Sequence, residues 1–505
     1  MRKFGLIVLG RQRFSIKKKA MVKKTLKALG IALALLIVVL LVKTLTYKTR
    51  QIAVEPLAPV ALSDKCITHL SEAVKIKTVS HDVTTLDSAP FYQFQAFLKQ
   101  SYPLADSLLH RQCINKLSLL YTWKGKNPAL QPLLLIGHMD VVPAENGGGE
   151  QWEFPPFSGE INNNAVCGRG TLDDKVNVIG LLEAVEMLLK EGFKPERTIY
   201  LAFGHDEEIG GEKGAAKIAA YLQEQHVKAG FLLDEGLVIT KGIVPGIKKN
   251  VALIGISEKG YVSVELAVET DGGHSSMPAR ETAIGILSEA VSKLEKHPMR
   301  SQLSAPVQRF LDYVGPEMPF LQRLAFANQW LLKNLILSIY EKSSNAGNAL
   351  VRTTTAPTLF KSGTKDNVLP GYATATLNFR ILPGETSDDV MAHIRKTIKD
   401  KRVKAKKLPN FSEPSPVSEI DCPEFACLQK SISQTFSNTI IAPSLVLAAT
   451  DARHYSAITK NLYRFIPLIA ESDDLKRIHG VNEKISCSDF LNAVRFYRQL
   501  IINAQ

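Results

Sequence analysis

Short apolar runs alternate with helical patterns in the first half of the chain. Runs of strand length occur at Leu133–Ile136, Ile199–Phe203 and Phe231–Leu233. The stretches Val176–Lys190 and Glu212–Gln225, which lie between them, have the apolar spacing of helices. Strands that are apolar throughout and separated by helices are typical of a parallel sheet covered on both faces. We therefore predict an α/β domain with a mostly parallel sheet flanked by helices.

The pattern changes near Gly260, where apolar and polar residues begin to alternate. The segment Tyr261–Glu269 alternates as a half-exposed strand, and a helical pattern follows at Glu281–Glu295. The same order recurs at Ala373–Arg380 and Ser387–Lys399, with acidic residues in the first turn of the second helix, where the helix dipole favours them. These two units predict a smaller α+β sandwich inserted in the larger domain.

A helical insertion separates the two units at residues 300–350, and it includes Phe320–Leu337. The apolar stripe of this stretch favours a core or a partner-facing surface over a cofactor site. Residues 405–420, with three prolines, then return the chain to the larger domain.

An unbroken apolar run, Ala28–Val42, lies near the N-terminus. Counted through Lys43 to Tyr47 it reaches about twenty residues, the length of a membrane-spanning helix, and Lys43 can snorkel to the surface. The ten Lys and Arg residues before it predict a cytoplasmic N-terminus and a body on the exported side, whether periplasmic, luminal or extracellular. No clear signal-peptidase site follows. A buried core helix is the alternative, and whether the helix is cleaved stays open.

Length and composition allow more than one hydrophobic core. With 505 residues, 45% of them apolar, two domains are expected. Without the ten basic residues before Ala28, the net charge of +13 falls to +3. That is too little for a basic face that binds nucleic acid.

Taken together, these patterns predict the domain organisation of the chain. We predict a basic cytoplasmic tail at 1–27, a membrane anchor helix at 28–47, a linker at 48–62, the larger domain at 63–258 and 411–505, and the inserted domain at 259–410.

Polar clusters follow the three apolar strands at their carboxyl ends. They are His138-Met139-Asp140, Asp206-Glu207-Glu208 and Asp234-Glu235, and a fourth cluster, Asp173-Asp174, opens a helix. In an open parallel sheet, ligand sites form at this edge, so we expect the clusters to converge. One histidine with several carboxylates, plus a distant second histidine, suits two divalent ions, zinc foremost.

Six motifs resemble those of a known enzyme family. They are GHMDVVP (137–143), GRGTLDDK (168–175), GHDEEIGG (204–211), LLDEG (232–236), GGHSSMP (272–278) and IHGVNE (478–483). In this order they resemble the zinc-dependent aminoacylase and carboxypeptidase family, which includes aminoacylase, glutamate carboxypeptidase, succinyl-diaminopimelate desuccinylase and yeast carboxypeptidase S. The second and third motifs and the long insertion resemble the branch of carboxypeptidase S and the secreted N-fatty-acyl amino acid hydrolases.

The resemblance implies a centre of two zinc ions. His138 and Asp234 would hold one ion, Glu208 and His479 would hold the other, and Asp173 would bridge the two. Each of these ligands binds metal in its deprotonated form. Cobalt or manganese would be substitutes for zinc.

The resemblance also implies a catalytic base. Glu207 would take a proton from the water between the ions and deliver it to the leaving amine. Asp140, on the same strand as His138, would orient that imidazole. The implied reaction is hydrolysis of an amide or peptide bond next to a free amino-acid carboxylate, as in a carboxypeptidase or an N-acyl amino acid hydrolase.

Three residues resemble family positions that bind substrate, here a small peptide or an N-acyl amino acid. Arg380, in NFRILPG, would clamp the substrate carboxylate. Asn367 and His274 would contact the substrate and stabilise the oxyanion. In related enzymes the inserted domain often forms a homodimer in which its histidine reaches the neighbouring active site, and whether His274 acts within one chain stays open.

Two other interpretations remain. A membrane-anchored binding protein on the same fold would have no need of Glu207 beside an intact ligand set. A cytoplasmic aminoacylase would require that the N-terminal helix is not an anchor. The acyl-group preference depends on pocket residues scattered over both domains.

Overall fold

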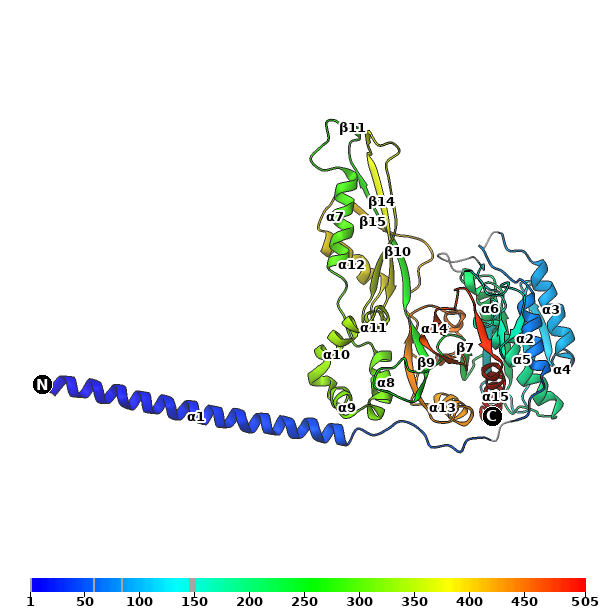
Figure 1. The fold of residues 1–505 in the computed structure, drawn as a ribbon, viewed down its shortest axis with the longest axis horizontal. Helices are drawn as coiled ribbons and strands as arrows, with labels where there is room; N and C mark the ends of the chain where they lie inside the picture. Colours follow the sequence, from blue (N-terminus) through cyan, green and yellow to red (C-terminus); the bar gives the residue numbers. More distant parts are fainter. Residues whose placement is uncertain (1, 58–59, 83–84, 145–150) are drawn as a thin grey trace.

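A computed structural model describes residues 2–57, 60–82, 85–144 and 151–505. Figure 1 shows a long helix, α1 (Arg2–Leu45), leading into a body of two lobes. This helix includes Met21–Leu45, the one stretch among the described residues that is long and apolar enough to cross a membrane. Residues 2–27, predicted as a separate tail, are helical and continuous with it, and the helix ends at Leu45 rather than Tyr47.

The larger lobe is built on a ten-stranded mixed sheet. Its central strands, in spatial order, are β6 (Ile199–Gly204), β3 (Leu133–His138), β7 (Phe231–Asp234) and β17 (Leu462–Arg464), and all four are parallel. Antiparallel neighbours extend it as β2 (Ser118–Trp123) and β1 (His110–Ile114) beyond β6, and as β9 (Asn250–Glu258) beyond β17. The predicted α/β architecture around parallel central strands is confirmed.

The central strands are buried on both faces, which explains their unbroken apolar sequences. Alternate residues of β3, from Leu133 to Ile136, pack into one core with α5 (Lys175–Lys190) and into a second core with α6 (Ala215–Glu224). Helix α15 (Cys487–Asn503) lies beside α5 in the first core.

Shorter elements of the two lobes complete the chain, together with those described below. They are α2 (Lys65–Lys75), α3 (Ala89–Ser101), α4 (Pro103–Leu108), α11 (Asn345–Val351), α13 (Pro423–Thr435), α14 (Ser472–Leu475), β4 (Glu160–Asn162), β5 (Ala165–Cys167), β8 (Ile239–Thr240), β11 (Gly273–His274), β13 (Val368–Leu369), β16 (Thr439–Val446), β18 (Ile469–Ala470) and β19 (Lys484–Ser486).

The smaller lobe is an antiparallel sheet packed against two helices. Its strands, in spatial order, are β12 (Thr354–Ser362), β14 (Tyr372–Ile381), β10 (Gly260–Glu269) and β15 (Val403–Lys407). The helices α7 (Ala283–Lys296) and α12 (Ser387–Ile398) share one core with this sheet, as the two predicted units require. Lys259 alone separates β9 of the larger lobe from β10.

The helical insertion differs from the prediction in two ways. The stretch Phe320–Leu337 is broken at the buried Asn328 into α9 (Phe320–Ala327) and α10 (Gln329–Ser343). In addition, α8 (Ala305–Val314) packs against β16, and its last two residues belong to the core of the larger lobe. Part of the predicted inserted domain is therefore built into the larger one.

Candidate metal centre

The predicted polar clusters meet at the carboxyl ends of the central strands. His138 is the last residue of β3, and it lies in register with Gly204, the last residue of β6. Glu207 and Glu208 follow β6 in a short 3-10 turn. Asp173 comes from a third direction, immediately before the residue that caps α5.

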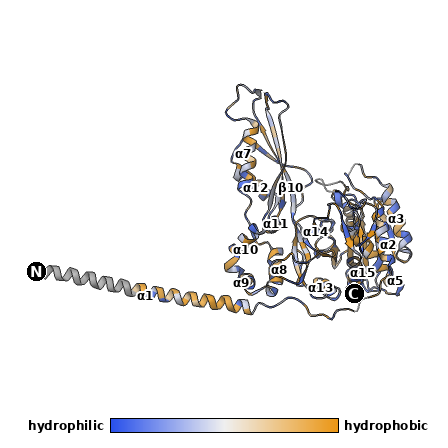
Figure 2. Ribbon diagram, in the orientation of Figure 1, coloured by the Kyte–Doolittle hydropathy of each residue, from blue (hydrophilic) through white to orange (hydrophobic). Residues whose placement is uncertain are grey.

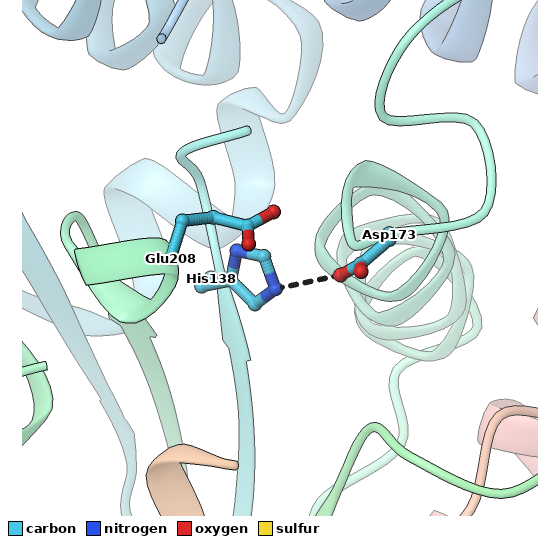
Figure 3. Close-up of side chains that lie close together, drawn as sticks. All are labelled: His138, Asp173 and Glu208. Carbon is cyan, nitrogen blue, oxygen red and sulfur yellow. Dashed lines mark hydrogen bonds and ion pairs between the residues drawn. The ribbon is translucent and has the colours of Figure 1, made fainter. Parts of the chain in front are cut away.

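Asp173 lies between two histidines. Its Oδ1 is 2.9 Å from Nε2 of His138, and its Oδ2 is 3.0 Å from Nε2 of His479. Oε2 of Glu208 is 3.2 Å from the same nitrogen of His479. Figure 3 shows His138, Asp173 and Glu208 converging from separate elements. Each Asp173 oxygen faces a different histidine, which is how one carboxylate can serve two adjacent cations.

The charges of this cluster suit divalent cations. Hydrogen bonds to Asp173 and Glu208 raise the pKa of His479 to about 10. Burial alone would raise the pKa of Asp173, but hydrogen bonds from His138 and His479 keep it below its usual range. Oε1 of Glu208 is buried and has no hydrogen-bond partner among the described residues. Imidazole nitrogens and carboxylate oxygens are zinc ligands, and a cation would satisfy this unpaired oxygen, so the donor set fits zinc.

Asp140 connects His138 to the turn that carries the glutamates. The main-chain oxygen of Asp140 is 3.0 Å from Nδ1 of His138, and its carboxylate Oδ1 is 3.4 Å from that nitrogen. The same carboxylate accepts hydrogen bonds from the N–H groups of Glu207 and Glu208, both at 3.1 Å. Asp140 therefore contacts the turn of Glu207 and Glu208 as well as the imidazole of His138, which is the one contact predicted from the sequence.

Glu207 and Glu235 add buried carboxylates to the centre. Burial raises the pKa of Glu207 well above its usual range. Burial, followed by the charges of Asp173 and Asp234, does the same for Glu235. Sequence analysis did not select Glu235 as a site residue, although it stands next to Asp234 in the motif LLDEG.

The predicted ligand Asp234 is the last residue of β7. Its Oδ1 accepts a hydrogen bond from the N–H of Glu235 at 2.9 Å, and its Oδ2 accepts one from the N–H of Ala452 at 2.7 Å. Burial raises the pKa of Asp234 to about 6. Both of its oxygens therefore bind the main chain, and Glu235 presents a second carboxylate from the adjacent position.

A buried ion pair joins the loop of Asp173 to the loop of His479. A guanidinium nitrogen of Arg169 is 2.6 Å from Oε2 of Glu483. The second terminal nitrogen of Arg169 donates to the main-chain oxygen of His479 at 3.2 Å, while Oε1 of Glu483 accepts hydrogen bonds from N–H groups of the Asp173 loop. Neither Arg169 nor Glu483 is among the predicted site residues, although both lie inside the motifs GRGTLDDK and IHGVNE.

Arg380 lies in β14 and is half-buried, on the side of the sheet opposite the core that Phe379 and Ile381 share with α7 and α12. Its guanidinium carbon is 5.0 Å from the centre of the Tyr261 ring. Burial, with a smaller contribution from the charge of Arg453, lowers the pKa of Arg380. Arg453 in turn donates to the carbonyl oxygen of Gly210 at 2.7 Å, just beyond the turn that carries Glu207. Arg380 is thus linked, through the charge of Arg453, to the segment that follows Glu207 and Glu208.

His274 and Asn367 lie together elsewhere. His274 pairs with Val368 between β11 and β13, and the N–H of Ser275 donates to the main-chain oxygen of Asn367 at 3.2 Å. Figure 1 shows β11 at the tip of the smaller lobe, away from the larger one. Within one chain, the structure does not bring these two predicted substrate residues to the metal cluster.

The chain is similar to known proteins over most of its length. Residues 134–503 match the family described as peptidase family M20/M25/M40. The chain is 41% identical over 482 residues to a probable carboxypeptidase S-like protein of Dictyostelium discoideum, covering 93% of this chain and 92% of the relative. It is also 41% identical over 496 residues to the N-fatty-acyl-amino acid synthase/hydrolase PM20D1 of Xenopus tropicalis, covering 96% of each.

Two further similarities extend to yeast and to a solved structure. Carboxypeptidase S of Saccharomyces cerevisiae is 31% identical over 498 residues, covering 88% of this chain and 84% of the relative. An M20 family metallo-carboxypeptidase from Sulfolobus solfataricus superposes with a TM-score of 0.62 at 18% identity, covering 87% of this chain and 99% of that one. The latter similarity concerns the fold.

Proposed function

Since the chain belongs to peptidase family M20/M25/M40 and is a metal-dependent hydrolase of amide bonds, we propose that its substrate carries a free carboxylate beside the scissile bond. Small peptides and N-acyl amino acids are the two substrate classes. The observation that carries the metal-dependent chemistry is the position of Asp173 between His138 and His479. Arg380, whose charge acts on Arg453 beside the turn of Glu207, is proposed to supply the charge that the substrate carboxylate needs.

Two zinc ions are the metals proposed for this centre. His138 and Asp173 would hold one ion, together with a carboxylate at the end of β7, and Asp173, Glu208 and His479 would hold the other. When bound, such ions polarise a carbonyl group and acidify water. Cobalt and manganese accept the same nitrogen and oxygen donors and are the expected substitutes.

Asp234 and Glu235 are both candidates for the carboxylate at the end of β7. The hydrogen bonds of Asp234 to the main chain favour a structural contribution from it, and the charge of Asp173 close to Glu235 favours Glu235 as a ligand. Metal analysis of Asp234→Asn and Glu235→Gln separates the two assignments. Loss of one zinc per chain identifies the ligand, provided that the variant remains folded.

Glu207 is proposed to carry the proton transfers. Its carboxylate accepts a proton from the attacking water as the C–O bond forms, and gives that proton to the leaving nitrogen as the C–N bond breaks. The pKa raised by burial favours the protonated state between these two steps. Asp140 holds the N–H of Glu207 and the imidazole of His138, so it fixes the base relative to that ligand.

Arg380 is proposed to select substrates by their carboxylate. Its guanidinium can donate two parallel hydrogen bonds to a carboxylate, whereas a neutral amide accepts them less well. Amidation of the substrate should lower catalytic efficiency by roughly a hundredfold or more. Asn367 and His274 are proposed to contact the substrate from the smaller lobe of a second copy of the chain.

The N-terminal helix is proposed to hold the enzyme in a membrane. The stretch Met21–Leu45 has the required length and hydropathy, and it is exposed except at Leu36, Leu40 and Thr44. The basic residues that precede the apolar run favour a cytoplasmic N-terminus and a catalytic body on the exported side.

A hydrolysis screen with purified full chain tests the proposed activity. Dipeptides and N-acetyl, N-succinyl and N-fatty-acyl amino acids are compared with their C-terminal amides, before and after chelation and zinc addition. We expect zinc-dependent cleavage of the acids and little cleavage of the amides. Arg380→Ala should bring both to a similar low rate. Equal cleavage of acid and amide by the unaltered enzyme would exclude the carboxylate clamp.

A further inference from the structure

Helices α9 and α10 carry a row of exposed apolar side chains. Leu331, Leu335 and Ile339 follow one another at four-residue intervals, so they lie on one face of α10, and all three are exposed. Trp330 is 56% exposed, and Leu321 of α9 is 77% exposed. Apolar side chains gathered in this way mark a surface that meets another apolar phase.

These helices are bound directly to the last turns of α1. The side-chain amide of Asn328, between α9 and α10, is 3.2 Å from the carbonyl oxygen of Leu40 and 3.3 Å from Oγ1 of Thr44. A guanidinium nitrogen of Arg323 in α9 donates to the main-chain oxygen of Tyr47 at 2.9 Å. The Lys43 ammonium lies 5.4 Å from the centre of the Trp330 ring.

The position of these contacts along α1 determines the depth of α9 and α10 relative to the bilayer that α1 would span. At 1.5 Å per residue, the part of α1 from Ala28 to its end at Leu45 spans about 27 Å, close to the thickness of the bilayer hydrocarbon. Thr44 lies at the end of that span and Leu40 about 6 Å farther in, so Asn328, which contacts both, lies near the boundary of the bilayer. Trp and Lys side chains are typical of this boundary. Figure 1 shows α9 and α10 on the side of the body that is nearest to α1, and Figure 2 shows the hydrophobic character of α1 next to them.

We propose that the surface of α9 and α10 rests in the interface of the bilayer that holds α1. The occupant of this surface is lipid, with acyl chains against the apolar row. Lys342 lies on the same face of α10 as the row and Lys43 lies beside Trp330, and these two ammonium groups suit anionic headgroups. The proposal rests on the membrane anchor proposed above, and it adds a second, peripheral attachment that fixes the orientation of the body. The members of the surface are Phe320, Leu321, Trp330, Leu331, Leu335 and Ile339, flanked by Lys43 and Lys342.

The chain contains a natural probe of this surface, because Trp330 is one of only three tryptophans. The other two, Trp123 and Trp152, belong to the larger lobe, and Trp123 is buried. Full chain is placed in phosphatidylcholine and phosphatidylserine vesicles whose acyl chains are brominated near the headgroup. We expect these lipids to quench part of the tryptophan emission, and Trp330→Phe to abolish that quenching.

Two matched variants in the Trp330→Phe background locate the contact. Ile339→Trp places a probe at the far end of the apolar row, and we expect brominated lipid to quench it. Tyr92→Trp places a probe on an exposed site of α3, on the opposite side of the body in Figure 1, and it should not be quenched.

Flotation of the same vesicles separates failure of this inference from failure of the anchor. A chain that does not float with vesicles lacks the anchor, and both proposals then fall. If the chain floats with the vesicles but neither Trp330 nor the tryptophan of Ile339→Trp is quenched, the anchor proposal stands and the proposed lipid contact of α9 and α10 is wrong. If those probes are also shielded from aqueous acrylamide, a second protein chain rather than lipid covers the surface.

Discussion

The guanidinium of Arg169 and the carboxylate of Glu483 form a buried ion pair, 2.6 Å apart, that joins the loops of two proposed metal ligands. One loop carries Asp173, and the other carries His479. Neither loop belongs to the central sheet, so the distance between these two ligands depends on contacts such as this pair. The spacing of the metal centre is therefore partly set by residues that do not bind metal.

Removal of either partner of this pair should destabilise the fold and the centre. Arg169→Met or Glu483→Gln leaves one charge buried without its partner, which costs about 3–5 kcal/mol in the free energy of unfolding. Urea unfolding with zinc titration measures both effects. The matched control is Arg498→Met, which breaks a partly exposed pair with Glu191 and should cost about 0–1 kcal/mol. Equal losses of unfolding free energy in Arg169→Met and in Arg498→Met would contradict the special contribution of the buried pair.

Replacement of the two neighbouring glutamates should have different consequences. Glu207→Gln should lower turnover by at least roughly a hundredfold, the scale of a general base, while both metal ions remain bound. Glu208→Gln should lose metal, because Oε2 of Glu208 shares His479 with Asp173. Metal content and turnover are measured on the same preparations. Loss of zinc from the Glu207 variant would mean that the two assignments must be exchanged.

Zinc affinity should rise with pH through the neutral range. Hydrogen bonds to Asp173 and Glu208 raise the pKa of His479 to about 10, so the metal-free imidazole is protonated at pH 7 and zinc must displace that proton. Each displaced proton makes the affinity about tenfold higher per pH unit below the pKa. Competition with a chromophoric chelator between pH 6 and pH 7.5 measures the slope. An affinity independent of pH would contradict the raised pKa.

Mixing two inactive variants should restore activity if the smaller lobe works across a dimer. His274 lies at the tip of that lobe, away from the metal cluster of its own chain (Figure 1). A dimer of His274→Ala and Glu207→Gln would contain one complete site. Co-expression under two affinity tags isolates this mixed dimer, and each variant alone is the control. No recovery in the isolated mixed dimer would assign His274 to its own chain.

The parts of this structure that sequence could predict are those specified locally. Each central strand is buried on both faces, so its apolar residues stand side by side in the sequence, and its polar cluster follows at once. The break at Asn328 could not be predicted, because the buried amide is satisfied partly by Leu40, 288 positions away. The pairing of Arg169 with Glu483 spans 314 positions. Likewise, Asp234 and Glu235 are adjacent in sequence, and which of their carboxylates reaches the centre depends on how each side chain is directed at the end of β7.

Lys259, the single residue between β9 and β10, is placed where a hinge between the two lobes would lie. Lys259 is held by hydrogen bonds from its ammonium to the main-chain oxygens of Ala349 and Arg352, at 3.0 Å and 2.7 Å. Beyond it, the ten residues of β10 extend about 33 Å at 3.3 Å per residue. A rotation of about 10° at this fulcrum would therefore swing the end of β10 through about 6 Å. Such a rotation would move the tip, with His274 on it, much farther than any residue close to Lys259.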